Sequence, residues 1–252
     1  GIGGGCFILV RAADGRVVAI DGRETAPARA HRDMFLRDGK ADAEASQTGP
    51  LAVAVPGALA AYQMAVETLG KKPLAALLEP GAEIAERGFA IDAVYARNIR
   101  QSQKAIATFP ATRALLLQAD GEPLQAGAML VQPDLAATYR AIINHGTDWF
   151  YRGEFAERVA AWMREHHGLV TADDFAAYRP LRREPLVTNY RGYTVIGFPP
   201  PSSGGLHVAQ ILNILEPFPV REIAKRDPSQ WTHLVTEAGK LAFADRAYWL
   251  GE

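Results

Sequence analysis

The sequence predicts an α+β fold with a large helical share and a small content of β-sheet. Two stretches rich in Val and Ile, at about 6–24 and 185–198, flank a long region with helical periodicity. The 252 residues suit one buried core, and 48% hydrophobic with 22% charged residues is close to the average of soluble globular proteins. Strands and helices that are segregated along the chain are typical of the α+β class.

The first predicted element is a β-hairpin that begins at Cys6. Two apolar runs, residues 6–12 and 16–21, are joined by Asp14-Gly15. An Asp-Gly pair between such runs favours a type I′ turn, in which both central residues have positive φ. We therefore expect two antiparallel strands joined by a tight turn.

The central region carries the start and stop signals of several helices. Pro and Gly residues bound most of the stretches with a helical repeat, which are 56–69, 73–87, 92–106, 133–144 and 154–166. Thr171 and Asp174 form a capping pattern, with a hydroxyl three residues before an acid. Strands return at 185–198 around a turn at Arg191-Gly192, and two further helices are expected, one ending near 215 and one over 229–248.

Charge and composition exclude several classes of partner. With 27 Lys and Arg against 28 Asp and Glu, the formal net charge is −1, which argues against nucleic acid or an anionic membrane as the main partner. No run of 18 or more apolar residues occurs, so no membrane span is predicted. The single cysteine, Cys6, excludes an internal disulfide and any metal site built from several cysteines.

Three features look like chemical motifs but have simpler explanations. The glycines at 1–5 lack the Lys-Ser or Lys-Thr of a phosphate-binding loop, so they are expected to allow close backbone packing. His166 and His167 are adjacent, whereas metal-ligand pairs on a helix lie four residues apart. Ser202 and Ser203 lack a Gly-x-Ser-x-Gly elbow, and Ser203 suits a helix N-cap, although such a rigid loop can also shape a pocket. We therefore predict no cofactor and no metal ion.

One segment, Asp21-Gly-Arg-Glu-Thr-Ala-Pro27, has more specific chemical content. Arg23 follows a predicted strand end, where the chain leaves the sheet and where functional residues concentrate. Its planar guanidinium can bind a carboxylate through two parallel hydrogen bonds, which Lys cannot reproduce. The alternative is a surface ion pair with Glu24 or Asp21, worth at most about 1 kcal/mol. The residues alone leave both interpretations open.

At this segment the sequence resembles the large subunit of the γ-glutamyltranspeptidases. The similarity extends over essentially the whole chain, in the family's order. The matching blocks are Gly1-Ile-Gly-Gly-Gly5, Asp21–Pro27, Val55-Pro-Gly57, Val131-Gln-Pro-Asp-Leu-Ala136, Phe150-Tyr-Arg-Gly153, Asp174-Phe-Ala-Ala-Tyr178, Tyr190-Arg-Gly-Tyr193, Pro199-Pro-Pro-Ser-Ser-Gly-Gly205 and Leu241-Ala-Phe-Ala-Asp-Arg246.

The resemblance implies an N-terminal-nucleophile hydrolase with a four-layer αββα core. In this family a precursor cuts itself into a large and a small subunit. The small subunit's N-terminal threonine attacks the γ-glutamyl amide of substrates such as glutathione, with its own α-amine as base. Arg23 matches the arginine that binds the substrate's α-carboxylate, and it is the one site residue predicted here. The resemblance also implies a small-subunit partner and a periplasmic or secreted location.

The sequence departs from a whole enzyme of this kind. The family's nucleophile lies in a Thr-Thr-His-like motif, and no such string occurs in residues 1–252. We therefore expect residues 1–252 to be one partial large subunit, the helical half, without its first and last segments, without a catalytic residue, and inactive alone. Two alternatives are a related acylase that acts on cephalosporin side chains or poly-γ-glutamate, and a scaffold subunit that binds a partner without chemistry.

Overall fold

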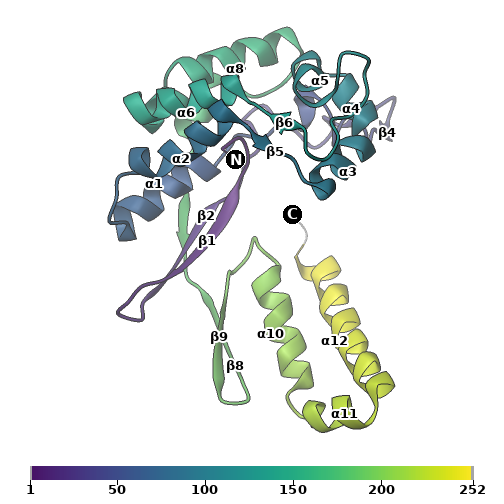
Figure 1. Cartoon of the computed structure of the whole chain (residues 1–252). Helices are drawn as coiled ribbons and strands as arrows, with labels where there is room; N and C mark the ends of the chain where they lie inside the picture. Colours follow the sequence, from purple (N-terminus) through teal and green to yellow (C-terminus); the bar gives the residue numbers. More distant parts are fainter. Residues whose placement is uncertain (1, 251–252) are drawn as a thin grey trace.

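The sheet that positions the predicted site has three strands and draws on both halves of the chain. The computed structural model describes residues 2–250 (Figure 1). Strand β1 (Cys6–Arg11) pairs antiparallel with β2 (Val17–Gly22), which confirms the predicted hairpin. The other edge of β2 pairs antiparallel with β7 (Leu181–Arg183), so the order is β1-β2-β7. Strand β2 is therefore central, and its last four residues are buried.

The predicted type I′ turn of this hairpin is wrong. Gly15 has a φ of 90°, and Asp14 is not among the residues with positive φ. The Gly15 N–H donates to the Ala12 carbonyl, and the Ala12 N–H donates to the Arg16 carbonyl. These bonds describe a longer loop, in which the Asp14 carboxylate accepts from the Arg16 N–H and only the glycine must take positive φ.

Nine α-helices lie between the second and third strands of this sheet in the described chain. They are α1 (Ala58–Leu69), α2 (Leu74–Arg87), α3 (Ala93–Gln101), α4 (Gln103–Ala107), α5 (Pro110–Leu116), α6 (Pro133–His145), α7 (Thr147–Tyr151), α8 (Glu154–Glu165) and α9 (Ala172–Ala177). The predicted helices are confirmed to within two residues, except that 92–106 is divided at Ser102. Helices α5 and α7 were not predicted. The same region holds a short 3-10 helix (Pro50–Ala52) and the two-stranded pairs β3 (Leu36–Arg37) with β4 (Lys40–Ala41) and β5 (Phe89–Ala90) with β6 (Met129–Leu130).

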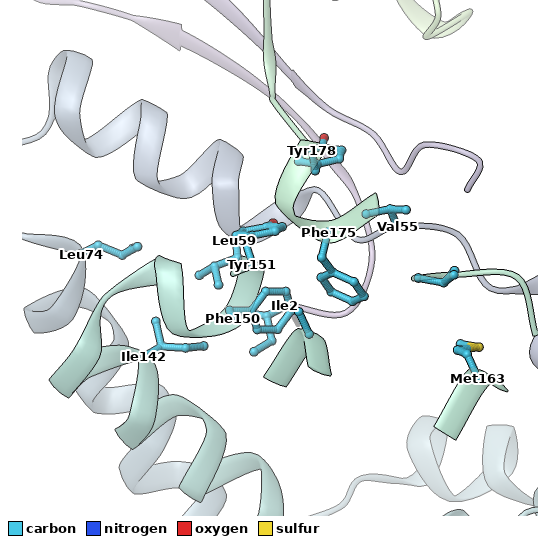
Figure 2. Packing of buried hydrophobic residues seen from close by; sticks show 12 residues of the cluster. Ile2, Val55, Leu59, Leu74, Ile142, Phe150, Tyr151, Met163, Phe175 and Tyr178 are labelled. Carbon is cyan, nitrogen blue, oxygen red and sulfur yellow. The ribbon is translucent and has the colours of Figure 1, made fainter. Parts of the chain in front are cut away.

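An aromatic cluster forms the main core beneath α1 (Figure 2). Phe150 is fully buried, stacks on Phe155 at 4.1 Å between ring centroids, and meets Phe175 edge-on. Tyr151 and Tyr178 continue the cluster at its margin, with their rings nearly parallel and 5.9 Å apart. This core therefore places two tyrosine hydroxyls close to the start of α1 and the end of β2.

The last quarter of the chain forms a separate group of elements (Figure 1). Strands β8 (Leu186–Tyr190) and β9 (Tyr193–Gly197) form a hairpin that packs on α10 (Gly204–Leu215). The short α11 (Val220–Arg226) connects α10 to α12 (Pro228–Trp249), and α12 packs on both of these helices. The predicted turn at Arg191-Gly192 is confirmed, and both residues have positive φ, as a type I′ turn requires. Ser203 occupies the N-cap position of α10, but its side chain makes no capping bond.

Large apolar side chains lie open to solvent in this group and on β1. Tyr248 and Trp249 are 77% and 73% exposed, and Phe243, Val187 and Phe7 are also exposed. Several exposed aromatic residues in one region are typical of a surface that contacts another protein chain. None of the helices formed by residues 2–250 combines the length and the hydropathy that a membrane crossing requires.

Candidate functional site

Arg23 is half-buried and is the first residue after β2, as the sequence predicted. Two residues later the chain forms an antiparallel bridge to the segment before α1: the Val55 N–H donates to the Thr25 carbonyl at 2.9 Å, and the Thr25 N–H returns the bond at 3.3 Å. The chain that carries Arg23 is thus held at the strand on one side and at this bridge on the other.

The Asp21 carboxylate is buried directly beneath Arg23, with 6% of the residue exposed. Its Oδ1 accepts the Arg23 backbone N–H at 3.0 Å. Its Oδ2 accepts Nε and Nη2 of Arg183 on β7, at 3.0 and 2.9 Å. The Glu24 carboxylate accepts the Gly5 N–H at 2.6 Å. The two carboxylates that the sequence offered as ion-pair partners for Arg23 thus accept hydrogen bonds within the sheet and its entry segment: Asp21 from Arg183 and the Arg23 backbone, and Glu24 from the Gly5 backbone.

Tyr178, at the end of α9, holds the other side of the Arg23 backbone. Its hydroxyl donates to the Arg23 carbonyl at 2.7 Å, although 155 residues separate the two in sequence. Burial raises the pKa of Tyr178 well above its usual range, so the hydroxyl keeps its proton. The hydroxyl of the neighbouring Tyr151 donates to the Pro56 carbonyl and accepts the Ala60 N–H, and burial raises the pKa of Tyr151 to about 12.

Glycines allow the sheet and α1 to come into direct backbone contact here. A Cβ built at Gly57 would overlap the Tyr178 hydroxyl and the Gly22 carbonyl. The Gly4 carbonyl accepts the N–H groups of Gly57 and Ala58, which satisfies donors at the start of α1. The predicted close packing of the glycine-rich opening is confirmed at Gly4 and Gly5, where an added Cβ would meet Glu24, but not at Gly3, which has open space around it. Gly1 lies outside the described residues.

The cap of α9 ties the segment after Arg23 to the rest of the site. Thr171 and Asp174 form the predicted capping box, in which the Thr171 hydroxyl accepts the Asp174 N–H and the Asp174 carboxylate accepts the Thr171 N–H. The other oxygen of Asp174 accepts the Ala28 N–H at 2.8 Å. One carboxylate thus joins α9 to the loop that follows Arg23.

Replacing this carboxylate should have a pH-dependent cost. Burial opposes ionisation of Asp174, but hydrogen bonds from Ala28 and Thr171 outweigh it and hold its pKa below the ordinary value. A lowered pKa contributes stability above the unfolded-state value of about 3.9, and that stability is lost as pH falls through the folded-state value. We expect Asp174→Ala to lower the free energy of unfolding of the chain by about 1–2 kcal/mol at pH 7, and by less below about pH 4.

Urea unfolding of the processed full-length protein at pH 7 and pH 3 measures this difference, and Asp173→Ala is the matched control. Asp173 is the exposed neighbour of Asp174 in the first turn of the same helix. Equal losses for the two variants, or a loss for Asp174→Ala that does not change with pH, would contradict the assignment.

The other singled-out residues do not join this site. The His166 ring stacks on Trp162 at 4.1 Å and its Nδ1 lies 2.9 Å from the Trp162 carbonyl. His167, the residue after the C-cap of α8, has a φ of 61°. Within residues 2–250 no group of three or more His, Cys, Asp or Glu side chains could hold a metal ion.

Sequence reasoning missed three residues around Arg23. Asp21 was considered only as an alternative ion-pair partner, and Tyr178 and Arg183 were given no role. Asp21 and Tyr178 lay within family blocks, which were the only available signal. The pairing of β2 with β7, which brings Arg183 to Asp21, has no local signature in the sequence.

Comparisons with known proteins concern the chain as a whole. The family profile described as Gamma-glutamyltranspeptidase matches residues 1–252. The chain is 40% identical to a glutathione hydrolase proenzyme of Escherichia coli strain K12, over 100% of this chain and 43% of that protein. It is 42% identical to the Acylase ACY 1 proenzyme of Pseudomonas sp. strain SE83, over 98% of this chain and 45% of that protein.

Among solved structures, the γ-glutamyltranspeptidase of Helicobacter pylori matches with a TM-score of 0.95 and 35% identity. The match covers 100% of this chain and 72% of that one. The chain therefore spans less than half of the length of the two proenzymes it resembles, and most of the length of this solved chain.

Proposed function

Because the chain belongs to the γ-glutamyltranspeptidase family, whose members are enzymes with an N-terminal-nucleophile hydrolase fold, we propose that it is the large-subunit part of a γ-glutamyl hydrolase or transferase. The substrate class is glutathione-like: small molecules that carry a γ-glutamyl amide. The observation that carries the proposal is Arg23, held at the end of β2 by Asp21 and Tyr178 in a chain that matches the family throughout.

In the proposed reaction, a threonine hydroxyl of the small subunit attacks the γ-carbonyl carbon. The hydroxyl proton passes to the threonine's own α-amine and then to the leaving amine, so the amide C–N bond breaks as the ester forms. Water or an acceptor amine then cleaves the ester. The contribution of this chain is to bind and orient the substrate: the Arg23 guanidinium receives the α-carboxylate in a bidentate contact.

The partner in this proposal is the small subunit made from the same precursor. The relatives are named as proenzymes, and this chain spans under half of their length. The exposed apolar side chains of β1, of the β8–β9 hairpin and of α12 offer that subunit a hydrophobic surface. We also propose that the precursor is exported to the periplasm or secreted, as the family resemblance implies.

The test is to produce the full-length precursor and follow both its cleavage and its activity. We expect two chains that purify together and hydrolyse a γ-glutamyl anilide. Residues 1–252 alone should scatter light and bind an apolar dye, because the surface left uncovered is hydrophobic. A precursor that stays uncut and inactive would favour the scaffold alternative. An isolated chain that is monodisperse and binds no apolar dye would contradict the proposed surface for a partner subunit.

An acylase is the second candidate, because the chain is also 42% identical to an Acylase ACY 1 proenzyme over 98% of its length. The two candidates differ in the substrate group that must be recognised. A γ-glutamyl substrate carries a free α-carboxylate that suits Arg23, whereas a simple acyl side chain does not. Faster hydrolysis of an acyl amide than of the γ-glutamyl anilide would decide for the acylase.

A further inference from the structure

We propose that Asp21 and Tyr178 are positioning residues that fix the backbone on both sides of Arg23 and so set the direction in which its side chain leaves the backbone. The inference rests on the proposed function, in which Arg23 binds the α-carboxylate of the substrate. Neither residue needs to touch the substrate: one bonds the N–H of Arg23 and the other its carbonyl.

The two bonds act on different peptide planes. The Arg23 N–H belongs to the plane before its Cα, and the Arg23 carbonyl belongs to the plane after it. Fixing both planes fixes φ and ψ of Arg23, and with them the direction of its Cα–Cβ bond. Asp21 Oδ1 lies 3.0 Å from the N–H nitrogen and Tyr178 Oη lies 2.7 Å from the carbonyl oxygen.

Asp21 is itself held rigidly by Arg183. Two nitrogens of that guanidinium donate to Oδ2, while Oδ1 remains for Arg23, so both carboxylate oxygens have partners. Charge-assisted bonds of this kind are short and about twice as strong as neutral ones. Arg183 reaches Asp21 because β7 pairs with β2 in a register that sets Arg183 opposite Ala19 and Leu181 opposite Asp21.

Tyr178 is held equally well. Its ring lies 5.9 Å from that of Tyr151 and nearly parallel to it, and only 7% of the residue is exposed. The absence of a side chain at Gly57 leaves room for its hydroxyl. The hydroxyl therefore has a fixed place from which to hold the Arg23 carbonyl.

We call the contacts of Asp21 and Tyr178 with the Arg23 backbone the brace. The brace matters because bidentate recognition of a carboxylate depends on the orientation of the guanidinium. A guanidinium that is tilted away from the plane of the carboxylate keeps its charge and loses one of its two parallel hydrogen bonds. The effect should appear only with substrates that carry the α-carboxylate. A residue that merely stabilises the fold would affect all substrates equally.

The experiment compares Tyr178→Phe with Tyr151→Phe in the processed full-length protein. Tyr178→Phe removes the bond to the Arg23 carbonyl and keeps the ring. Tyr151→Phe removes the hydroxyl of the neighbouring buried tyrosine, which bonds Pro56 and Ala60 instead. With a γ-glutamyl anilide, Tyr178→Phe should raise KM by about 3- to 10-fold and change kcat little. With 4-aminobutanoyl anilide, which lacks the α-carboxylate, it should have no effect beyond that of Tyr151→Phe.

Asp21→Asn is the second variant, since it keeps the size of the side chain and removes the charge that holds Arg183. We expect the same selective rise in KM, of about 10-fold. In an Arg23→Ala background, neither Tyr178→Phe nor Asp21→Asn should raise KM for the γ-glutamyl anilide further, because the oriented group is gone.

The outcomes separate the brace from the function on which it rests. If Arg23→Ala is selective for the carboxylate-bearing substrate but Tyr178→Phe and Asp21→Asn are not, the brace is wrong and the function stands. If Arg23→Ala is not selective, the proposed role of Arg23 is wrong. A selective effect of Tyr151→Phe equal to that of Tyr178→Phe would also overturn the brace.

Discussion

Residues 1–252 produced alone are expected to show no γ-glutamyl hydrolysis. In the proposed reaction the nucleophile is a threonine in a Thr-Thr-His-like motif, and that string does not occur in these residues. The donors that stabilise the oxyanion are expected on the small subunit as well, and one such donor alone typically contributes a factor of 10² or more in rate. The measurement is turnover of a γ-glutamyl anilide by the purified chain, with the processed full-length protein as the positive control.

Turnover that follows the chain through successive purification steps would mean that these residues contain a nucleophile of their own. Recovery of activity on adding a separately produced small subunit would support the proposed division of labour, since binding residues and nucleophile would then be shown to reside on different chains.

Arg23→Ala in the processed full-length protein is expected to lower kcat/KM for a γ-glutamyl anilide by roughly 10- to 150-fold. The estimate follows from a charge-assisted hydrogen bond to a carboxylate, worth about 1.5–3 kcal/mol. Part of the loss should appear in KM, because the carboxylate is present in the ground state and in the transition state. Arg23→Lys should lose less than Arg23→Ala, since it keeps the charge and loses the planar fork.

The control for Arg23 is a substrate without the α-carboxylate. That substrate should be poor for the wild-type protein and nearly indifferent to either substitution. A structural role for Arg23 would instead lower activity on both substrates by the same factor. Equal losses on the two substrates, or unchanged kinetics in Arg23→Ala, would falsify carboxylate binding.

The elements that the sequence predicts well are those with local signals. Helix α2 begins after Pro73 and ends at Gly88, whose φ is 80°, and both signals act within one or two residues of the helix end. The hairpin of β1 and β2 was predicted for the same reason. The predicted turn type was wrong because a two-residue turn and a loop longer by one residue suit the same pair of strands. The Asp14 carboxylate, which accepts the Arg16 N–H, stabilises the longer loop.

The candidate site was only partly predictable, for a different physical reason. Arg23 could be found because it lies in a short, distinctive segment at a strand end. Its supporting contacts could not: Arg183 is 162 residues from Asp21, and Tyr178 is 155 residues from Arg23. No periodicity or spacing rule relates residues so far apart, and only the pairing of β2 with β7 and the packing of α9 bring them together.

This separation has a consequence for the order in which the chain folds. Strand β2 meets β1 across a short loop, but it meets β7 only after the whole helical region between them has been enclosed. Closing a flexible loop of that length costs roughly 4–5 kcal/mol of chain entropy, and contacts of this kind form slowly. We expect the helices from α1 to α9 to form first and the surroundings of Arg23 to be completed last. A partly folded chain would then have a formed hydrophobic core but no means of aligning its arginine, so carboxylate binding would report that the final long-range closure has taken place.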